Sequence, residues 1–508
     1  MAINLLDTNA GGYTPSFSTL FNSQAVGGVL TVLFVCGFML IANILRRKIR
    51  FLRRSLMPTS VIAGLLGLVI KEVIFYSTGF SIFSGDALST IVYYALPVAF
   101  IALCLREKDD YASEFNKKKV KTERVTAVKS GSVIVSTYLM QALVGIGAAV
   151  LCTLFVTNFN PAGGLMLPLG YGQGPQQAYA TGTIWDKAGY FSAWGDTGAI
   201  NFGLAIAAFG FLWASIPGII FVNRAAKRKG IKRNENENQT SGELKSHTVE
   251  EAGEVPLSES IDKFTLQICM VGGVLAVTMG LLMSINAIFN ATGNDYLINK
   301  LMPIIWGFMF IFAALIAILT KVILRRLVKS GIMHRKYPNS YMMNRISGAA
   351  FDISITAALF AISVEALGTL WIPILVISTV GGFASIYYLR YLCNYIYKDY
   401  KDEAFLAMYG MLTGVIANGM ILLREIDNDF STPAANDLLV GSSAAIVLGL
   451  PLLFLIAPAP SPGNLWWITI VIAVYFIALT AYQLGLFKKF RRKKEAAALQ
   501  KPTDETKK

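Results

Sequence analysis

The sequence predicts an all-α polytopic membrane protein with two inverted five-helix repeats, each carrying a re-entrant hairpin, and one extra C-terminal transmembrane helix. Three observations predict this fold class. The 508-residue chain is 54% hydrophobic and 15% charged, and its apolar residues gather in blocks near the ~20 residues that cross a bilayer. Its basic residues gather between those blocks. A glycine-bearing polar stretch interrupts each half of the chain before its fifth block.

The apolar blocks predict eleven spans, each long enough to cross the hydrocarbon as a helix. The expected spans lie at residues 26 to 45, 58 to 77, 88 to 105, 131 to 157, 198 to 223, 264 to 289, 299 to 320, 348 to 368, 371 to 395, 437 to 457 and 465 to 486. All five cysteines lie inside these blocks without CxxC spacing. We therefore expect neither a disulfide framework nor a structural metal site.

The net charge of +14 raises the question of nucleic-acid binding, which the positions of the basic residues answer. All but four of the 45 Lys and Arg residues fall in six segments, at 46 to 54, 106 to 129, 224 to 263, 321 to 345, 390 to 401 and 488 to 508. With eleven spans these segments share one side, which the positive-inside rule makes cytoplasmic. Residues 1 to 25 are then extracytoplasmic, residues 487 to 508 form a basic cytoplasmic tail, and no nucleic-acid partner is expected.

The polar segment 224 to 262 is expected to be a flexible cytoplasmic linker between the two halves of the chain. It separates a first repeat, 26 to 223, from a second, 263 to 457, and the extra helix at 465 to 486 follows. Because five spans is an odd number, the second repeat must enter the membrane in the opposite orientation. Inverted repeats whose broken segments meet near the midplane are a recurring plan of secondary transporters.

Each repeat contains a stretch expected to form a hairpin. The first, near 160 to 182, contains "LPLGYGQGPQQAYATG", and the second, near 404 to 429, contains "MYGMLTGVIANGMILLREIDND". Glycine lets the backbone turn tightly and approach a ligand closely, and irregular backbone at membrane depth is tolerated only where protein or a water-filled cavity borders it. The alternative for the first stretch is an ordinary extracellular loop.

Several of these residues carry a resemblance to a known family. The runs "GQGPQQAYATGTIWDKAGY" and "GAINFGLAIAAFGFLWASIPGIIFVNR" resemble the region of bacterial sodium/glutamate symporters where a Gly-Gly-His-Gly-Thr-type hairpin precedes a glycine-bearing helix. Gly172 and Gly174 match that hairpin, and "GMLTGVIANGMILL" is similar to the second hairpin of the family. Gln173 and Pro175 stand where the family has His and Thr, and the chain is longer. The chain thus resembles a divergent, longer member.

The resemblance implies a homodimeric carrier in the bacterial cytoplasmic membrane that works by an elevator-like alternating-access step. The implied activity is sodium-coupled symport of glutamate or a related small carboxylate, with Na⁺ as the coupling ion. Because the hairpin departures fall at the expected site, a carrier of another organic anion, such as a hydroxycarboxylate, is the alternative. An ion channel is an alternative from another class. No HExxH, GxSxG or His/Asp cluster lies inside the spans, so we do not expect an enzyme.

The candidate site residues come from the two hairpins and from the eighth span. We expect the substrate to be bound by Gly172, Gln173, Gly174, Thr413, Asn418 and Arg424. The Arg424 guanidinium is the candidate partner of a substrate carboxylate; the alternative is a membrane-boundary residue paired with Glu425 or Asp427. Asp352, Ser354 and Thr356 are the candidate sodium ligands, because carboxylate and hydroxyl oxygens suit a hard cation and intramembrane carboxylates are rare; the alternative for Asp352 is a helix cap or an interfacial position.

Overall fold

The structure, a computed structural model, describes residues 24 to 78, 85 to 106, 117 to 230, 263 to 333, 337 to 428 and 430 to 499. The expected N-terminal segment, nearly all of the central linker and the last nine residues of the tail lie outside the described residues. Every regular element within the described ranges is helical. Nine of these helices are long and apolar enough to cross a membrane, which confirms the expectation of a helical, multi-pass membrane protein.

The first half of the chain forms helices close to the expected spans, followed by a broken segment. The helices are α2 (Gln24–Lys48), α3 (Arg50–Arg54), α4 (Thr59–Thr78), α5 (Gly85–Leu105) and α6 (Lys117–Cys152). The broken segment consists of η2 (Pro161–Leu165), α7 (Met166–Pro168), η3 (Leu169–Gln173) and α8 (Pro175–Lys187). After η4 (Ser192–Trp194), the long helix α9 (Gly198–Lys229) completes this half.

The second half contains a similar succession of long helices and a second broken segment. It begins with α10 (Lys263–Thr292), η5 (Leu297–Leu301), α11 (Met302–Gly307), α12 (Met309–Lys329) and α13 (Ser340–Ala361). It continues with η6 (Glu365–Leu370), α14 (Trp371–Ile396), η7 (Lys398–Tyr400), and the broken pair α15 (Lys401–Thr413) and α16 (Ile416–Arg424). The last helices are α17 (Ala434–Ile456) and α18 (Asn464–Leu499).

Two expected spans differ from the structure. The block at 299 to 320 is divided between η5, α11 and α12, because the chain leaves helical geometry at Phe308, where φ is −99° and ψ is 25°. The block at 348 to 368 belongs mostly to α13, which ends at Ala361. Neither α12 nor α13 is among the nine apolar helices; α12 carries Lys321 and the Arg325-Arg326 pair.

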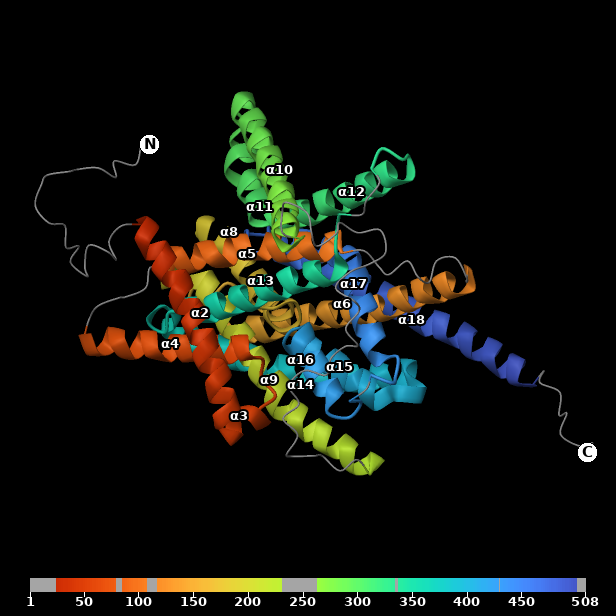
Figure 1. Cartoon of the computed structure of the whole chain (residues 1–508). Helices are drawn as coiled ribbons and strands as arrows, with labels where there is room; N and C mark the ends of the chain where they lie inside the picture. The colour runs from red at the N-terminus through yellow and green to blue at the C-terminus, as the bar shows by residue number, and fades with distance from the viewer. Residues whose placement is uncertain are drawn as a thin grey trace, which may run out of the picture.

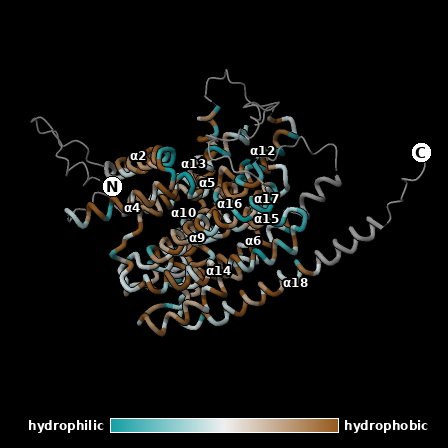
Figure 2. The backbone as a smooth tube through the Cα atoms, turned by 90° about the horizontal axis from the view of Figure 1, so that it is seen from below, coloured by the Kyte–Doolittle hydropathy of each residue, from teal (hydrophilic) through white to brown (hydrophobic). Residues whose placement is uncertain are grey.

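The helices form two bodies, named here the hairpin body, after the two expected hairpins, and the lateral body, and each hydrophobic core lies mostly within one of them. The hairpin body consists of α6, both broken segments, α9, α14, α17 and α18, and its core buries large side chains such as Tyr171, Trp185 and Tyr409. The lateral body consists of α2, α4, α5, α10, α12 and α13, and its two smaller cores lie mainly around α4 and α13 and around α5 and α12. Figure 1 shows α10 and α11 extending away from the rest at the top of the view. Hydrophobic residues, drawn in brown, predominate along the helices (Figure 2).

Within the lateral body, α5 and α13 lie side by side (Figure 1) and each receives a lysine at its C-terminal end. Lys71 of α4 donates to the carbonyls of Phe360 and Ile362, at the end of α13. Lys321 of α12 donates to the carbonyls of Cys104 and Arg106, at the end of α5. In both cases one acceptor is the penultimate helical residue and the other directly follows the helix. Cations suit these positions because the last carbonyls of a helix lack intrahelical donors.

The extra helix α18 packs on the hairpin body. Its Gln483 side chain, 1% exposed, donates to Ser136 Oγ of α6 at 3.2 Å. The Tyr475 hydroxyl donates to the Leu448 carbonyl of α17 at 2.8 Å. Polar contacts of this kind fix the register of helices that lipid surrounds. The structure therefore attaches α18 to α6 and α17.

Candidate functional site

The first broken segment leaves helical geometry at Gly174, between η3 and α8. This residue has φ 93° and ψ 171°, a backbone conformation that a side chain would strain. Pro175 follows as the first residue of α8, where its fixed φ and missing N–H are harmless. The Gly-Pro pair therefore ends η3 and starts α8. Gln173, a candidate substrate ligand, is half-buried directly before Gly174.

Tyr138 of α6 packs against Gly172, two residues before the break at Gly174. Its hydroxyl donates to the Gly172 carbonyl at 3.0 Å, and a Cβ on Gly172 would lie 2.2 Å from Tyr138 Cε1. Real carbon atoms do not approach so closely. The glycine at position 172 therefore allows the hairpin to lie directly on the tyrosine ring.

The second broken segment has a comparable break between α15 and α16. Helix α15 ends at Thr413. Gly414 leaves helical geometry, with φ −141° and ψ −112°, and Val415 is extended before α16 begins at Ile416. The Gln141 side chain donates to the carbonyl of Leu412 at 2.8 Å and to Ser385 Oγ at 2.9 Å. The hydroxyl of Thr413, a candidate substrate ligand, instead donates to the Tyr409 carbonyl at 2.7 Å.

The two breaks lie against each other in the hairpin body. A Cβ on Gly174 would lie 3.1 Å from Val415 Cγ1, and a Cβ on Gly210 of α9 would lie 2.7 Å from the Thr413 carbonyl oxygen. Helices α8 and α16 both begin at this meeting point. The N-terminus of a helix carries unpaired N–H groups and a positive partial charge. Two such termini at one place favour an anion.

Several buried polar atoms in the first two turns of α8 and the first turn of α16 have no hydrogen-bond partner among the described residues. They are Gln176 Nε2, Gln177 Oε1 and Thr181 Oγ1 of α8, and Asn418 Oδ1 of α16. All four side chains are at most 4% exposed. A buried polar atom without a partner costs about 1 to 3 kcal/mol. Such a concentration is therefore expected where a ligand supplies the missing partners.

Gln176 also lines a small cavity at the contact between the two bodies. This cavity, about 10 Å³, lies between α8, α5 and the junction of α11 and α12. A larger groove of about 430 Å³ shares three of its walls, Tyr93, Tyr179 and Gly307. The Tyr93 hydroxyl donates to the Trp306 carbonyl at 2.9 Å and ties α5 to α11. The groove therefore leads along α8 to the neighbourhood of Gln176.

The far end of α8 supports the start of α9. Asp186 accepts hydrogen bonds from the backbone N–H groups of Ala199 at 2.7 Å and Ile200 at 2.9 Å. Burial raises the pKa of the Asp186 carboxyl to about 7, although both N–H donors act to lower it. This carboxylate is therefore a cap of α9.

The candidate sodium ligands on α13 do not converge. Residues two apart on an α-helix point about 200° away from each other, so Ser354 faces away from Asp352 and Thr356. The Thr356 hydroxyl donates to the Ser60 carbonyl at 3.0 Å, and Asp352 is exposed. Ser354 Oγ is fully buried and has no partner among the described residues. The structure thus separates Ser354 from the other two oxygens.

Arg424 lies at the opposite end of α16 from the break. It is half-buried and is the last residue of the helix, which places it about 12 Å along the axis from Ile416 at 1.5 Å per residue. Asp427, one of its alternative partners, accepts four hydrogen bonds from Ser431 and Thr432. The structure therefore brings Gly174 and Asn418 to the meeting point but not Arg424.

The base of the second hairpin is held by ion pairs. Asp402, in the first turn of α15, pairs with Arg228 at 3.1 Å and with Arg390 at 3.0 Å. Its neighbour Glu403 pairs with Lys229. Both acids are at most 7% exposed, and negative charge suits the start of a helix. These pairs fasten α15 to the ends of α9 and α14.

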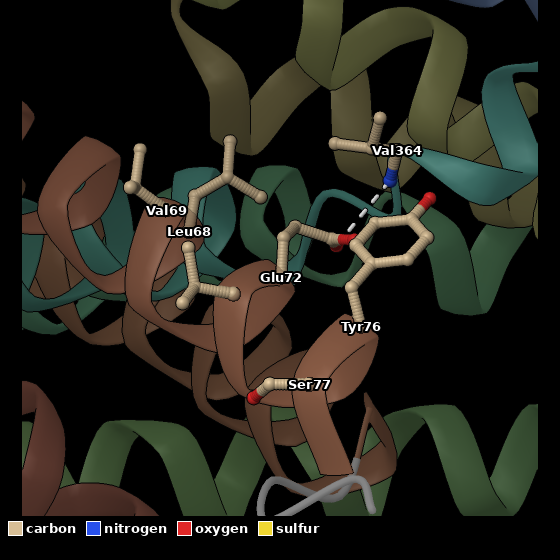
Figure 3. Close-up of a pocket in the computed structure, with 7 residues that line it drawn as sticks. Leu68, Val69, Glu72, Tyr76, Ser77 and Val364 are labelled. Atoms are coloured by element: carbon tan, nitrogen blue, oxygen red, sulfur yellow. Dashed lines mark hydrogen bonds between the residues drawn. The ribbon is translucent and has the colours of Figure 1, made fainter. Parts of the chain in front are cut away.

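A larger hollow lies at the end of α4, away from the hairpin breaks (Figure 3). Its volume is about 540 Å³ and its walls are mainly apolar, with Leu68, Val69 and Val73 among them. The Glu72 carboxylate accepts from the Val364 N–H, as the dashed line shows, and pairs with Lys71 at 3.4 Å. Because this acid is already engaged, the hairpin breaks are the better candidate site.

A comparison with protein-family models and with curated protein sequences finds no match. Within the described residues, no group of three or more His, Cys, Asp or Glu side chains is arranged to hold a metal ion. The chemistry of the candidate site is therefore that of amides, hydroxyls and helix termini. From the first broken segment the sequence prediction placed Gln173 among the substrate-binding residues and left Gln176, Gln177 and Thr181 out of that set. The signal that identifies them is the helix start at Pro175, which assigns them to α8.

Proposed function

We propose that this chain is a secondary active transporter of a small anion. The observation that carries the proposal is the meeting of two broken helical segments, from opposite halves of the chain, at which Gln176 and Asn418 keep buried, unpaired amide atoms. Opposed helix N-termini at a break in the chain suit an anionic substrate. The site is narrow, and a cavity of about 10 Å³ holds no more than about one water. This closure favours alternating access over an open channel.

The proposed architecture is a pair of inverted repeats with hairpins that enter the membrane from opposite sides. Two equivalent lysine contacts support it. Lys71 of α4 contacts the end of α13 and Lys321 of α12 contacts the end of α5, each through the penultimate helical residue and the residue after the helix. A second pair of contacts is related in the same way, with α12 in the place of α4 and α5 in the place of α13. Ser60 of α4 meets Thr356 of α13, and the Phe310 ring of α12 lies 5.2 Å from the Phe100 ring of α5. A twofold relation between α4-α5 and α12-α13 accounts for both pairs.

The proposed movement is an elevator-like displacement of the hairpin body against the lateral body. Its support is that each hydrophobic core is formed mostly by one body, with only a few side chains, such as Tyr179 and Phe310, contributed by the other. Helices α8 and α9 form the contact with α13, and α8 also touches α5 and α11. A step that slides α8 along these helices leaves most of each core intact. A homodimer, as the sequence resemblance implies, would hold the lateral bodies still in the membrane.

The proposed substrate is glutamate or a related small carboxylate, coupled to Na⁺. Glutamate carries a charge of −1, so symport with one Na⁺ gains nothing from the membrane potential, whereas a second Na⁺ adds ~2.3 kcal/mol per 100 mV. An accumulating glutamate carrier is thus expected to use at least two sodium ions. A hydroxycarboxylate is the second candidate substrate. Its anionic oxygens suit the same helix termini.

Uptake by proteoliposomes tests the proposal. Purified protein is reconstituted, and uptake of labelled L-glutamate, and separately of malate, is measured with an inward sodium gradient and with potassium in its place. We expect saturable, sodium-dependent uptake of one of the two, lost in the double variant Gln176→Leu, Asn418→Leu. Non-saturating flux of either anion would favour a channel. Saturable uptake that does not depend on sodium would support a carrier and refute Na⁺ as the coupling ion.

A further inference from the structure

Lys187 is an unusual basic residue in this chain. It is one of four, with Lys71, Lys300 and Arg424, that lie outside the six basic segments. Lys71 is engaged by helix-end carbonyls and Glu72, and the side chain of Lys300 lies outside the described part of the chain. Lys187 is exposed at the end of α8, on the side proposed to face outside. The positive-inside rule disfavours basic residues on that side. A function is therefore expected to account for the positive charge of Lys187.

Lys187 and Gln176 lie on the same face of α8. The positions 176, 180, 183 and 187 are related by steps of four, three and four residues, which is the spacing of one helical face. At 1.5 Å per residue, Lys187 lies about 16 Å from Gln176 along the helix. The unpaired amide at the hairpin break and the exposed ammonium are therefore the two ends of one stripe.

Thr183 and Lys187, the outer part of that stripe, lie in one wall of the groove of about 430 Å³, and Gln176 and Ala180, its inner part, line the adjoining cavity of about 10 Å³. The opposite walls come from α5 and α11, and most of the polar lining consists of hydroxyls, from Ser89, Thr90 and Thr183. Lys187 is the charged residue among the described residues that line it, and it forms no ion pair within the described ranges. The groove volume lies in the range of small-molecule sites.

The acid next to Lys187 does not neutralise it. Asp186 turns toward the start of α9, where both carboxylate oxygens accept backbone N–H groups. Successive residues on a helix are rotated by 100°, so the two side chains diverge. The groove thus presents a positive charge without a nearby compensating carboxylate on its own helix.

We propose that Lys187 is a recruiting residue that captures the small carboxylate in the groove and passes it along α8 toward Gln176. This inference rests on the proposed transport function and deepens it. The ammonium increases the local concentration of anions and steers their approach, an effect that falls with ionic strength. It acts before the substrate reaches the hairpin break, so it governs capture and leaves the translocation step unchanged.

The test compares Lys187→Gln and Lys187→Arg with the wild-type full chain in proteoliposomes, at low and at high ionic strength. The probe is whichever of L-glutamate and malate the wild type transports. For Lys187→Gln we expect KM to rise about fivefold at low ionic strength, the Boltzmann factor for one unit charge pair at contact in water, with Vmax unchanged. Lys187→Arg keeps the charge and should retain the wild-type KM. Lys329→Gln, the same change at the exposed end of α12, is the matched control and should leave KM unchanged.

The outcomes separate this inference from the transport proposal. If the wild type transports the probe and Lys187→Gln has the wild-type KM at low ionic strength, the recruiting role is refuted while transport stands. An increase in KM that persists unchanged at high ionic strength would also refute it, because a contact within the binding site is not screened. Equilibrium binding of the same probe to detergent-purified protein gives an independent readout. There Lys187→Gln should lower affinity by the same factor at low salt only.

Discussion

The two equivalent lysine contacts give the sharpest test of the repeat architecture. In Lys71→Met or Lys321→Met the stem is kept and the ammonium is removed, so each variant loses two charge-assisted hydrogen bonds to helix-end carbonyls. Hydrogen bonds to charged groups contribute about 1.5 kcal/mol or more each. Each variant also removes a charge from a mostly buried site, and the desolvation cost that disappears with the charge offsets part of this loss. We expect each variant to lower the free energy of unfolding by about 2 kcal/mol. The loss should be larger in Lys71→Met by up to about 1 kcal/mol, because this variant also loses the ion pair with Glu72.

Equilibrium unfolding in mixed micelles, followed by tryptophan fluorescence, measures the two losses side by side. Lys329→Met is the control, since this lysine is the exposed last residue of α12 and a surface substitution of this kind changes stability by about 0.5 kcal/mol or less. A large loss in one variant together with a control-sized loss in the other would refute the twofold relation. Two losses no greater than that of the control would refute the capping role itself.

Three further outcomes follow from the site. Gly172→Ala forces a Cβ into the Tyr138 ring; we expect a loss of about 1 to 3 kcal/mol from overpacking and slower uptake at unchanged sodium dependence, measured by unfolding and by proteoliposome flux. Gln176→Leu removes a buried unpaired donor, so unfolding should show neutral or increased stability while equilibrium dialysis shows weakened anion binding. Asp186→Asn leaves one acceptor for two N–H donors, and thermal unfolding at pH 8 should show a loss of about 1 kcal/mol that exposed Asp196→Asn lacks.

The sequence was sufficient to predict most helices because a span of about 20 apolar residues has few alternatives in lipid. Helix α9 begins at Gly198, where its span was expected. The interruption at Phe308 was not predictable in the same way. The block around it is apolar throughout, and the break depends on a tertiary contact, since a Cβ on Gly307 would lie 2.5 Å from Ile184 of α8. Hydropathy contains no information on which glycine a distant helix will contact.

The candidate site was predicted at the level of segments and less well at the level of side chains. Gly172 and Gly174 were selected as residues of close approach; Gly172 lies in η3 and Gly174 directly follows it. The glutamine chosen for the site was Gln173, whereas the buried unpaired amide belongs to Gln176. The difference of three residues depends on the helix start at Pro175, because only the helical part of the hairpin has a fixed inner face. The spacing of Asp352, Ser354 and Thr356 shows the same limit, since alternate residues share a face in a strand but not in a helix.

The unpaired atoms at the hairpin break constrain the ligand as well as its position. Gln176 Nε2 is a donor that needs an acceptor, and Asn418 Oδ1 is an acceptor that needs a donor. A simple dicarboxylate supplies only acceptors when ionised, so it satisfies the glutamine and leaves the asparagine oxygen unpaired. A substrate that carries an ammonium or a hydroxyl beside its carboxylate satisfies both. If these two amides form the site, succinate should therefore bind more weakly than either L-glutamate or malate, because the asparagine oxygen would remain buried without a partner at a cost of about 1 to 3 kcal/mol.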